Sequence, residues 1–559
     1  MRLVRQKPAL LLVPLALFFV VTGLIQAWRD APTVDETIDI AAGVTSLVRH
    51  DLLLNPDHGP LTKLIPALPA LAAHPIVPDG PGYESGDWFA HTSEFVQANE
   101  QAGRWHRIVF LSRLLPLAEG LAVGGLLSVL AARLFGAAAG VVAGGLWFTT
   151  PVFLGFSHLD GIDIPFTLVT LAASLLLLRY LEAPSDRRVV ELGLALGAAM
   201  LVRSVGLVLL FAMVVAIVIA EWRTPRQVLF RRAGLTALVP WATVWIAMRA
   251  FTLSAPSGAR GARLDAIISA GRSSSLLTRL VLAVPWPKEW AAGIAYVIVS
   301  PTSRPAYLFG SAWHGGRWWY FLGAVPVKVP LLALVVLLVG PWGWRQLSPE
   351  ARRRARLAIV LPAVALYLAV ALQPLDLGLR YVFPTLALWF VAASAIVHVG
   401  ALRVREVLLG GLAITQVAAM FVAYPHALAW TPPPFQPGYR VATDSNIDWG
   451  QDNWRVDDWA AGKAPLVDLL LPLGTTAPAG SRNLLSVPTT DIRGWVAVSA
   501  SKLLVSEESD QLAWLRAYCP VDTIGGSVLV YRFDAPVDTS PGPTRPADLC
   551  SGDVSRRVQ

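Results

Sequence analysis

Two adjacent carboxylates, Asp35 and Glu36, follow directly after the first long apolar segment of the chain. A carboxylate at the point where a hydrophobic helix leaves a bilayer can accept a proton from a hydroxyl group, so the pair is a candidate for catalysis at a membrane surface. An acidic first turn of a helix, or the start of a solvated loop, would place the same residues there without any chemistry. The chemical interpretation therefore depends on which other polar residues reach the same face.

Lys63 and His58 belong to a polar, proline-containing turn over residues 55–63, which opens another apolar stretch. An ammonium group at the membrane interface can pair with a lipid phosphate as a compact charge. Alternatively, Lys63 has no ligand and only extends its ammonium group from the membrane interface toward water. His58 is either a functional ligand or a hydrogen-bonding turn residue. Both interpretations of this turn stay open.

Two short connections between apolar segments also carry ionisable residues. The first contains His158 and Asp163, and the second contains Arg380. Such residues at the edge of a membrane segment are costly unless they are solvated or used. Asp163 can cap a helix that begins near Pro165. Basic residues are enriched in cytoplasmic loops, whereas Arg380 falls on the predicted exterior side. We therefore expect Arg380 to bind an anion or a carboxylate.

The composition is that of a membrane protein. The 559 residues are 55% hydrophobic and 15% charged, with a mean hydropathy of +0.54. A soluble protein of this size could not bury so much apolar surface, whereas runs of about 20 apolar residues fit the thickness of a bilayer. The net charge is +8, and the arginines cluster between the apolar segments. This pattern reports membrane topology, and we expect lipids and not nucleic acid as the surroundings.

About eleven apolar segments are long enough to cross a membrane. They lie near residues 8–28, 108–131, 137–156, 163–180, 189–202, 205–221, 234–253, 319–340, 357–373, 381–400 and 405–424. The arginine-rich connections place the N-terminus in the cytoplasm and the C-terminal region outside a plasma or inner membrane. The first segment is too long for a signal peptide and lacks its cleavage site, so we expect it to be retained. The predicted transmembrane module covers residues 1–424, with exterior loops at 29–107 and 254–318.

The C-terminal region has a more polar, turn-rich composition. Strand-like runs at 467–473, 494–499 and 527–533 predict a small exterior α/β domain over residues 425–535, followed by a flexible tail, 536–559. The chain's two cysteines, Cys519 and Cys550, both fall in this region. An oxidising exterior would allow a disulfide between them, and two free thiols are the alternative.

Taken in order, these motifs resemble those of bacterial C-type glycosyltransferases of the protein O-mannosyltransferase and aminoarabinose transferase type. The matching elements are Asp35-Glu36, residues 55–63, His158 with Asp163-Ile164-Pro165, residues 305–310, residues 318–321 with Lys328, and residues 377–381, 444–452 and 494–500. Each is weak alone, but together they cover nearly the whole chain. One departure is Gly59, where the family commonly has the proline of a His-Pro-Pro sequence. A glycine could loosen that turn.

The resemblance implies a polytopic helical C-type glycosyltransferase fold and inverting transfer of a sugar from a polyprenyl-phosphate donor. The acceptor would be a lipid, a glycan or a protein on the exterior side. By position, the resemblance implies Asp35 as the general base, and we take Asp35 and Glu36 together as the candidate catalytic pair. Lys63 and Arg380 are the candidate ligands of the donor phosphate. The candidate substrate-cavity residues are His58, His158, Asp163 and Asp448.

Cofactors and alternative functions stay open from the sequence. No set of metal ligands has a convincing spacing, although scattered aspartates and histidines could host a divalent cation. A transporter or flippase of lipid-linked sugar would carry ionisable residues in mid-span and repeat symmetry, neither of which the sequence indicates. A catalytically silent binding protein on the same fold is the other alternative.

Overall fold

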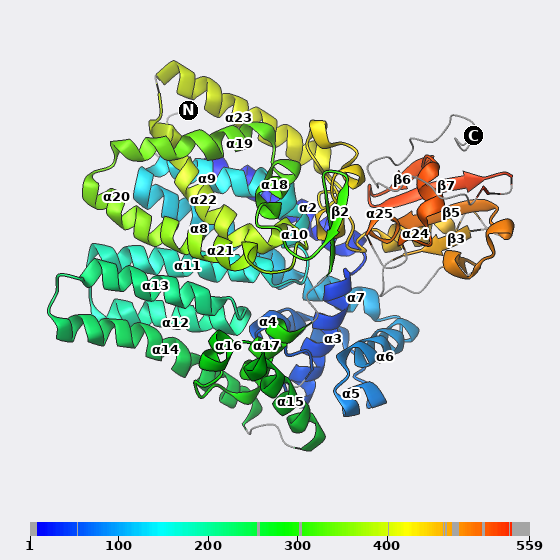
Figure 1. The fold of residues 1–559 in the computed structure, drawn as a ribbon. Helices are drawn as coiled ribbons and strands as arrows, with labels where there is room; N and C mark the ends of the chain where they lie inside the picture. Colours follow the sequence, from blue (N-terminus) through cyan, green and yellow to red (C-terminus); the bar gives the residue numbers. More distant parts are fainter. Residues whose placement is uncertain are drawn as a thin grey trace.

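The computed structural model describes residues 8–52, 54–253, 258–300, 304–400, 402–461, 463, 467–471, 480–505, 509–535 and 537–538. Within these residues the chain is mainly helical, and its long apolar helices lie side by side in one bundle (Figure 1). The C-terminal sheet lies beside one end of this bundle, at the right of the view.

The first part of the chain alternates long apolar helices with shorter ones. These are α2 (Leu12–Arg29), α3 (Val34–Arg49), α4 (Leu61–Ala70), α5 (Pro81–Ser85), α6 (Trp88–Gln101), α7 (Trp105–Ser112), α8 (Leu114–Phe135), α9 (Ala137–Thr149) and α10 (Pro151–Ser157).

The middle of the chain supplies most of the remaining bundle. Its elements are α11 (Asp163–Glu182), α12 (Asp186–Val202), α13 (Gly206–Glu221), α14 (Arg226–Thr252), α15 (Gly258–Ser274), α16 (Leu276–Val281), α17 (Lys288–Val299), β1 (Pro305–Leu308), β2 (Ser311–His314), α18 (Tyr320–Lys328), α19 (Leu331–Val339), α20 (Pro349–Ala355), α21 (Leu361–Ala371), the 3-10 turn η5 (Leu379–Val382), α22 (Phe383–Ala393) and α23 (Leu402–Ala423).

The apolar helices confirm a multi-pass membrane protein. Among the described residues, seven helices are long and apolar enough to cross a membrane, and α9 with α10 forms a pair, bent by 65°, that would make an eighth crossing. Every predicted span coincides with a helix or a helix pair, but α12, α13 and the α18–α19 pair are not among these candidate crossings. Pro330 separates α18 from α19 because proline cannot donate the backbone hydrogen bond of a continuous helix. Eight of the eleven predicted spans therefore coincide with candidate crossings, and the number of eleven stays a prediction.

Helix α3 begins at a capping box that fixes the first candidate motif. The Thr33 hydroxyl accepts a hydrogen bond from the Glu36 N–H, and the Glu36 carboxylate accepts one from the Thr33 N–H at 2.8 Å. This reciprocal pair satisfies backbone donors that a helix start leaves unpaired. Asp35 consequently lies in the first turn of α3, next to the end of α2.

The predicted loop 254–318 contains more structure than the sequence indicated. The helices α15, α16 and α17 are followed by the antiparallel hairpin β1–β2, in which Pro305 pairs with His314. The sequence predicted a helix near 276–299, where α16 and α17 lie, but it did not predict the hairpin. In Figure 1 these helices lie near α3 to α6, on the same side of the bundle.

The C-terminal region folds around a mixed sheet of the order β4-β3-β5-β7-β6. Its elements are η9 (Asp444–Asn446), α24 (Asn453–Ala460), β3 (Val467–Leu470), β4 (Arg482–Asn483), β5 (Gly494–Ser499), α25 (Ala500–Leu504), β6 (Asp522–Ile524) and β7 (Val528–Phe533). Strand β3 is parallel to β4 and β5, and β7 is antiparallel to β5 and β6. The three predicted strands are thereby confirmed as β3, β5 and β7.

The segment before this sheet is tied to the membrane bundle. The Ala31 N–H donates to the Gln451 carbonyl at 2.9 Å, and the Val34 N–H donates to the Trp449 carbonyl at 3.3 Å. The buried Lys328 ammonium donates to three backbone carbonyls of the C-terminal region, those of Leu428, Trp430 and Asn446, at 2.6 to 2.7 Å. Residues 428–451 therefore complete the surroundings of α3.

Candidate active site

A polar cavity of about 240 Å³ lies beside the N-terminal end of α3. Its walls come from segments that are far apart in the sequence. The ionisable lining residues are Asp35, Asp39, Asp57, His58, Arg203, Tyr296, Arg304, Arg380 and Tyr381. Since carboxylates and guanidinium groups face one space, the cavity can receive an anion and a hydroxyl group together.

Asp35 and Arg380, which the sequence proposed for different tasks, are in direct contact. The Asp35 side chain is 46% exposed, and its Oδ2 accepts a hydrogen bond from Nη2 of Arg380 at 3.1 Å. Both residues line the cavity. The candidate base and the candidate phosphate ligand are therefore close enough to act on the same substrate.

The Arg380 guanidinium has a spare donor. Its Nη1 lies 3.6 Å from Oδ2 of Asp163, and its face lies 3.9 Å from the Trp449 ring centroid. Its buried Nε has no hydrogen-bond partner among the described residues. An unsatisfied buried donor is unfavourable, so a bound anion that accepted this hydrogen bond would stabilise the site.

Arg203 is a site residue that the sequence analysis missed. Its Nη1 donates to Oδ1 of Asp163 at 2.8 Å, and its guanidinium lies 4.8 Å from the Tyr381 ring centroid. Asp163 thus holds Arg203 and Arg380 together from the first turn of α11. Asp163 is buried and is not among the lining residues, which makes it a positioning residue and not a substrate contact. An arginine between two apolar segments was the available signal for Arg203.

The structure contradicts a catalytic role for Glu36. Its buried carboxylate accepts two hydrogen bonds from the Arg113 guanidinium, each at 2.8 Å, and a third from the Asp160 N–H at 2.8 Å. The capping bond from the Thr33 N–H adds a fourth. These contacts occupy the carboxylate and shield it from the cavity. Glu36 fixes the start of α3, and only Asp35 of the pair faces the cavity.

Lys63 lies behind the cavity wall and not within it. Its ammonium donates to Oδ1 of Asp57 at 3.2 Å and to the backbone carbonyl of Asn55. Asp57 and Asn55 line the cavity, whereas Lys63 lines a smaller neighbouring one. The structure therefore pairs Lys63 with Asp57 outside the lining of this cavity, and its predicted contact with a phosphate stays a prediction. In this arrangement the lysine positions the turn.

Asp39 is a second carboxyl group of the cavity that the sequence analysis did not single out. Its Oδ1 accepts a hydrogen bond from the Asn55 amide at 3.1 Å. Burial, with help from the nearby Asp57 and Asp35 carboxylates and against the pull of Lys63, raises the pKa of Asp39 to about 8. Asp39 can thus hold a proton at neutral pH while facing the same space as Asp35.

His58 lines the cavity, as predicted, and its Nε2 lies 3.6 Å from Oδ2 of Asp57. Burial lowers the pKa of His58, although Asp57 opposes the shift. The adjacent Gly59 is packed tightly: a Cβ atom there would lie 1.9 Å from the Leu201 carbonyl oxygen, and its N–H donates to Val202 at 3.2 Å. A proline would lose that bond and clash, so the glycine fits this turn and does not loosen it.

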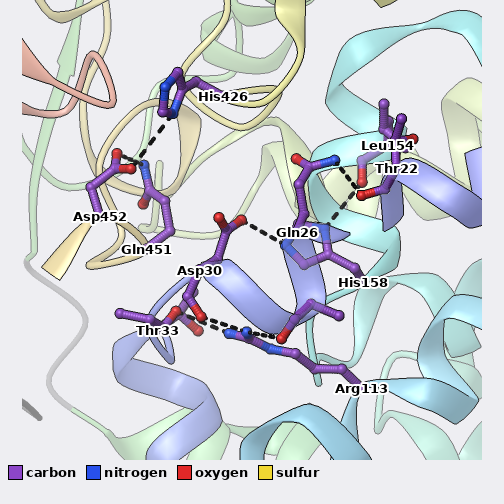
Figure 2. A network of polar contacts seen from close by, with 12 residues as sticks. Thr22, Gln26, Asp30, Thr33, Arg113, Leu154, His158, His426, Gln451 and Asp452 are labelled. Atoms are coloured by element: carbon purple, nitrogen blue, oxygen red, sulfur yellow. Dashed lines mark hydrogen bonds and ion pairs between the residues drawn. The ribbon is translucent and has the colours of Figure 1, made fainter. Parts of the chain in front are cut away.

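His158 lies outside the cavity, contrary to the prediction. The side chain is buried, with Nδ1 3.3 Å from the Leu154 carbonyl oxygen and Nε2 2.9 Å from Oδ2 of Asp30 (Figure 2). Asp30 also forms an ion pair with Arg455 of α24. His158 therefore helps to join the end of α2 to the C-terminal region.

Asp448 also has a structural role where a cavity role was predicted. Its Oδ2 accepts hydrogen bonds from the Ser499 hydroxyl and, at 2.8 Å, from the Ser501 N–H. Burial raises the pKa of this carboxyl group to about 6, although both hydrogen bonds favour its charged form. These contacts connect the loop that carries Trp449 to the C-terminal sheet, so Asp448 positions Trp449.

A separate apolar groove of about 560 Å³ takes one of its lining residues from the same 3-10 turn, η5, that lines the polar cavity. Residues of α18, α19, α21 and α22 form its walls. Within η5, Arg380 and Tyr381 line the polar cavity, and the next residue, Val382, lines the groove. The single turn η5 therefore contributes both to the polar cavity and to the apolar groove.

Two further predictions are not settled by this geometry. Among the described residues, no group of three or more His, Cys, Asp or Glu side chains is placed to hold a metal ion. A divalent cation stays an untested prediction. Cys550 lies outside the described residues, so the bridge from Cys519 stays a prediction as well.

Two solved structures show a distant likeness to this chain. The ArnT of Cupriavidus metallidurans bound to undecaprenyl phosphate is 17% identical, with a TM-score of 0.45, and the match covers 75% of this chain and 65% of that one. The apo oligosaccharyltransferase of Archaeoglobus fulgidus is 14% identical, with a TM-score of 0.47 and coverage of 81% and 58%. This chain thus spans about three fifths of the length of these two proteins.

The sequence-based comparisons are narrower. No curated protein matches the chain. A family model described as dolichyl-phosphate-mannose-protein mannosyltransferase matches residues 110–246, the segment that contains His158, Asp163 and Arg203. The resemblance drawn from the motifs is therefore confirmed by the family model over residues 110–246.

Proposed function

We propose that this protein is an integral-membrane glycosyltransferase that moves a sugar from a polyprenyl-phosphate donor to an acceptor at the exterior face of a plasma or inner membrane. The observation that carries the proposal is the position of η5. Its Arg380 joins Asp35 in a polar cavity, and its Val382 opens onto an apolar groove. A substrate with a charged phosphate and a long hydrocarbon chain suits this arrangement. The family match over residues 110–246 supports the same class of reaction.

The phosphate of the donor would lie among the guanidinium groups of Arg203, Arg304 and Arg380. Charge-assisted hydrogen bonds from arginine strengthen as an oxygen gains negative charge. The bond between the anomeric carbon and the phosphate oxygen breaks during transfer, and its electron pair moves onto the phosphate. Guanidinium groups at this position therefore stabilise the transition state more than the ground state.

Asp35 would act as the general base. The bound phosphate competes with Asp35 for the Arg380 guanidinium and so frees the carboxylate. The acceptor hydroxyl then transfers its proton to Asp35 while its oxygen attacks the anomeric carbon from the face opposite the phosphate. The products are an inverted glycoside, polyprenyl phosphate and a protonated Asp35, which later returns its proton to water.

The apolar groove would hold the polyprenyl chain. Phe321, Leu338 and Trp389 are among the side chains of its wall. Burial of a hydrocarbon chain contributes about 0.8 kcal/mol for each methylene group removed from water. Because lipid tails are also apolar, the gain relative to a bilayer is smaller, and the groove would mainly align the chain with the phosphate site.

The test is release of polyprenyl phosphate by the purified protein. The protein in lipid nanodiscs is incubated with radiolabelled polyprenyl-phosphate sugars and a membrane extract that supplies acceptors. We expect Asp35→Asn to lower the rate about a hundredfold to ten-thousandfold, because it removes the general base. Asp79→Asn is the matched control, since Asp79 pairs with Arg49 on the surface, far from the lining residues, and is 88% exposed.

Two outcomes would contradict the proposal. Equal rates for the wild type and Asp35→Asn would remove Asp35 from the mechanism. Movement of the intact lipid-linked sugar between leaflets without release of polyprenyl phosphate would instead favour the flippase alternative.

A further inference from the structure

A second cleft, of about 820 Å³, opens between the end of α2, the start of α7 and helix α24. Its aromatic lining includes Trp28, His106 and Trp454, and its charged lining includes Arg29, Asp457 and Asp458. None of these residues lines the central cavity. None has a part in the proposed transfer reaction, so the cleft needs a separate explanation.

Three aromatic rings line the cleft in sequence, with the Trp28 and His106 planes at 80° and the His106 and Trp454 planes at 31°. The His106 ring lies 4.1 Å from the Trp28 ring and 4.5 Å from the Trp454 ring, measured between centroids. Trp28 is 50% exposed, and Trp454 is partly exposed. Flat aromatic surfaces of this kind stack on apolar faces, such as the C–H face of a pyranose ring.

The polar side of the cleft carries hydrogen-bonding groups of both kinds. Oδ1 of Asp457 is buried and has no hydrogen-bond partner among the described residues. Burial, with the nearby Asp458 and Glu100, raises the pKa of Asp457 to about 6. A hydroxyl donor that reached this oxygen would satisfy it. Arg29 also lines the cleft and offers donors to a ligand oxygen.

The cleft is connected to the central cavity by two paired segments. Residues 31–34 run beside residues 449–451, through the bonds from the Ala31 N–H to Gln451 and from the Val34 N–H to Trp449. Trp449 and Asp35 face the central cavity at one end of this pair. Trp454 and Arg29 face the second cleft at the other end. The cleft and the central cavity therefore lie at the two ends of one short pair of segments.

A lipid-facing aromatic belt accounts for only part of the cleft. Trp28 ends an apolar helix, where interfacial tryptophan is common. Trp454 belongs to α24, which is outside the candidate membrane helices, and its ring also contacts His106. Lipid contact gives no reason for Asp457 and Asp458 to stand beside these rings. A polyhydroxylated ligand explains the rings and the carboxylates together.

We propose that this cleft binds the glycan portion of the acceptor, with sugar rings stacked on Trp28 and Trp454 and hydroxyl groups bound by Asp457 and Arg29. The identification as an acceptor rests on the proposed transfer reaction. The binding of a glycan does not. The acceptor would then be a glycan, free or attached to a lipid or peptide, whose far end is held here while its reacting hydroxyl reaches Asp35.

The first experiment measures binding without catalysis. The full chain in nanodiscs is applied to an array of mannose-, glucose-, galactose- and arabinose-containing oligosaccharides, and the best ligand is titrated by microscale thermophoresis. We expect Trp454→Ala and the isosteric Asp457→Asn each to raise Kd at least about tenfold, equivalent to 1.4 kcal/mol. Trp222→Ala is the matched control, because Trp222 is 74% exposed and lies outside both cavities.

The same titration separates this inference from the proposed function. Asp35→Asn should keep the oligosaccharide affinity while losing transfer, and saturating polyprenyl phosphate should not displace the oligosaccharide. Displacement would place the sugar in the donor site and overturn the proposal. Failure of every oligosaccharide to bind, binding restricted to amine-bearing compounds, or unchanged affinity in both Trp454→Ala and Asp457→Asn would also overturn it. Transfer activity measured alongside shows whether the proposed function survives that result.

Discussion

Replacement of Glu36 tests whether the two adjacent carboxylates have the different roles that their surroundings indicate. The Arg113 guanidinium is fully buried, with 0% of its side chain exposed, and Glu36 supplies its charged partner. Loss of one partner of a buried ion pair costs about 3–5 kcal/mol, because an uncompensated charge stays behind. Loss of the capping bond to the Thr33 N–H adds about 1 kcal/mol. We therefore expect Glu36→Ala to lower the free energy of unfolding by about 4–6 kcal/mol.

The neighbouring Asp35→Asn provides the contrast. Asp35 is 46% exposed, and its ion pair with Arg380 faces the cavity. A pair of this kind contributes about 0–1 kcal/mol to stability. Asp35→Asn should therefore remove transfer activity and leave unfolding nearly unchanged. Reversible unfolding in mixed micelles, followed by tryptophan fluorescence, measures both variants.

A double variant isolates the ion pair itself. Glu36→Leu combined with Arg113→Met replaces both charges by apolar groups of similar length. It should be more stable than either single variant, because neither charge is left unpaired. A Glu36→Ala protein that unfolds like the wild type but has lost transfer activity would refute this reasoning and restore Glu36 to the catalytic centre.

Further predictions concern the phosphate site, the pH response and the cysteines. Arg380→Gln should weaken polyprenyl-phosphate binding by about tenfold to a hundredfold, because one or two charge-assisted hydrogen bonds are lost. Lys63→Gln should change this affinity less than about threefold. Surface plasmon resonance on captured nanodiscs compares the two variants. The pKa of Asp448 is raised from 3.8 to about 6, so ionisation of this carboxyl group disfavours the folded state. The contribution of neutral Asp448 to the stability of the fold is therefore fully present below about pH 4 and is lost as the pH rises through 6. Asp448→Asn should remove that decline, which the melting temperature measured from pH 4 to pH 8 reports. Mass spectrometry of non-reduced peptides should find Cys519 linked to Cys550, and two alkylatable thiols would refute that bridge.

The sequence predicted the membrane helices and the C-terminal strands well, because both depend on local patterns. Runs such as 163–180 and 405–424 are apolar throughout, and helices α11 and α23 occupy them. The segments near 189–202 and 319–340 also form helices, α12 and the α18–α19 pair, but these are not among the candidate crossings. Apolar residues in a helix of less than full length are buried against neighbouring helices, and hydropathy cannot distinguish that burial from contact with lipid.

The site was predictable only in part. Asp35, His58 and Arg380 line the cavity, and motif order was enough to select them. His158 and Asp448 were equally conspicuous in the sequence, but their partners, Asp30 and Ser499, satisfy them elsewhere.

The pairing of charges over long stretches of chain explains these failures. Glu36 meets Arg113 and Asp163 meets Arg203 only after the helices have packed. A motif therefore marks a charged residue without telling whether it faces substrate or another residue.

The hydrogen bonds from Lys328 to the C-terminal region have a consequence for biosynthesis. The last candidate span ends at Ala423, yet the three carbonyls that receive the Lys328 ammonium belong to residues 428, 430 and 446. A nascent chain that has inserted every span still carries this buried ammonium without those acceptors, at a cost of several kcal/mol. A ribosome that stopped just after Ala423 would release a protein with complete membrane topology and an unfinished interior. Such a truncated product is expected to be a substrate of membrane proteases, and pulse-chase labelling of chains ended at residues 424 and 460 would show the longer one to be the more persistent.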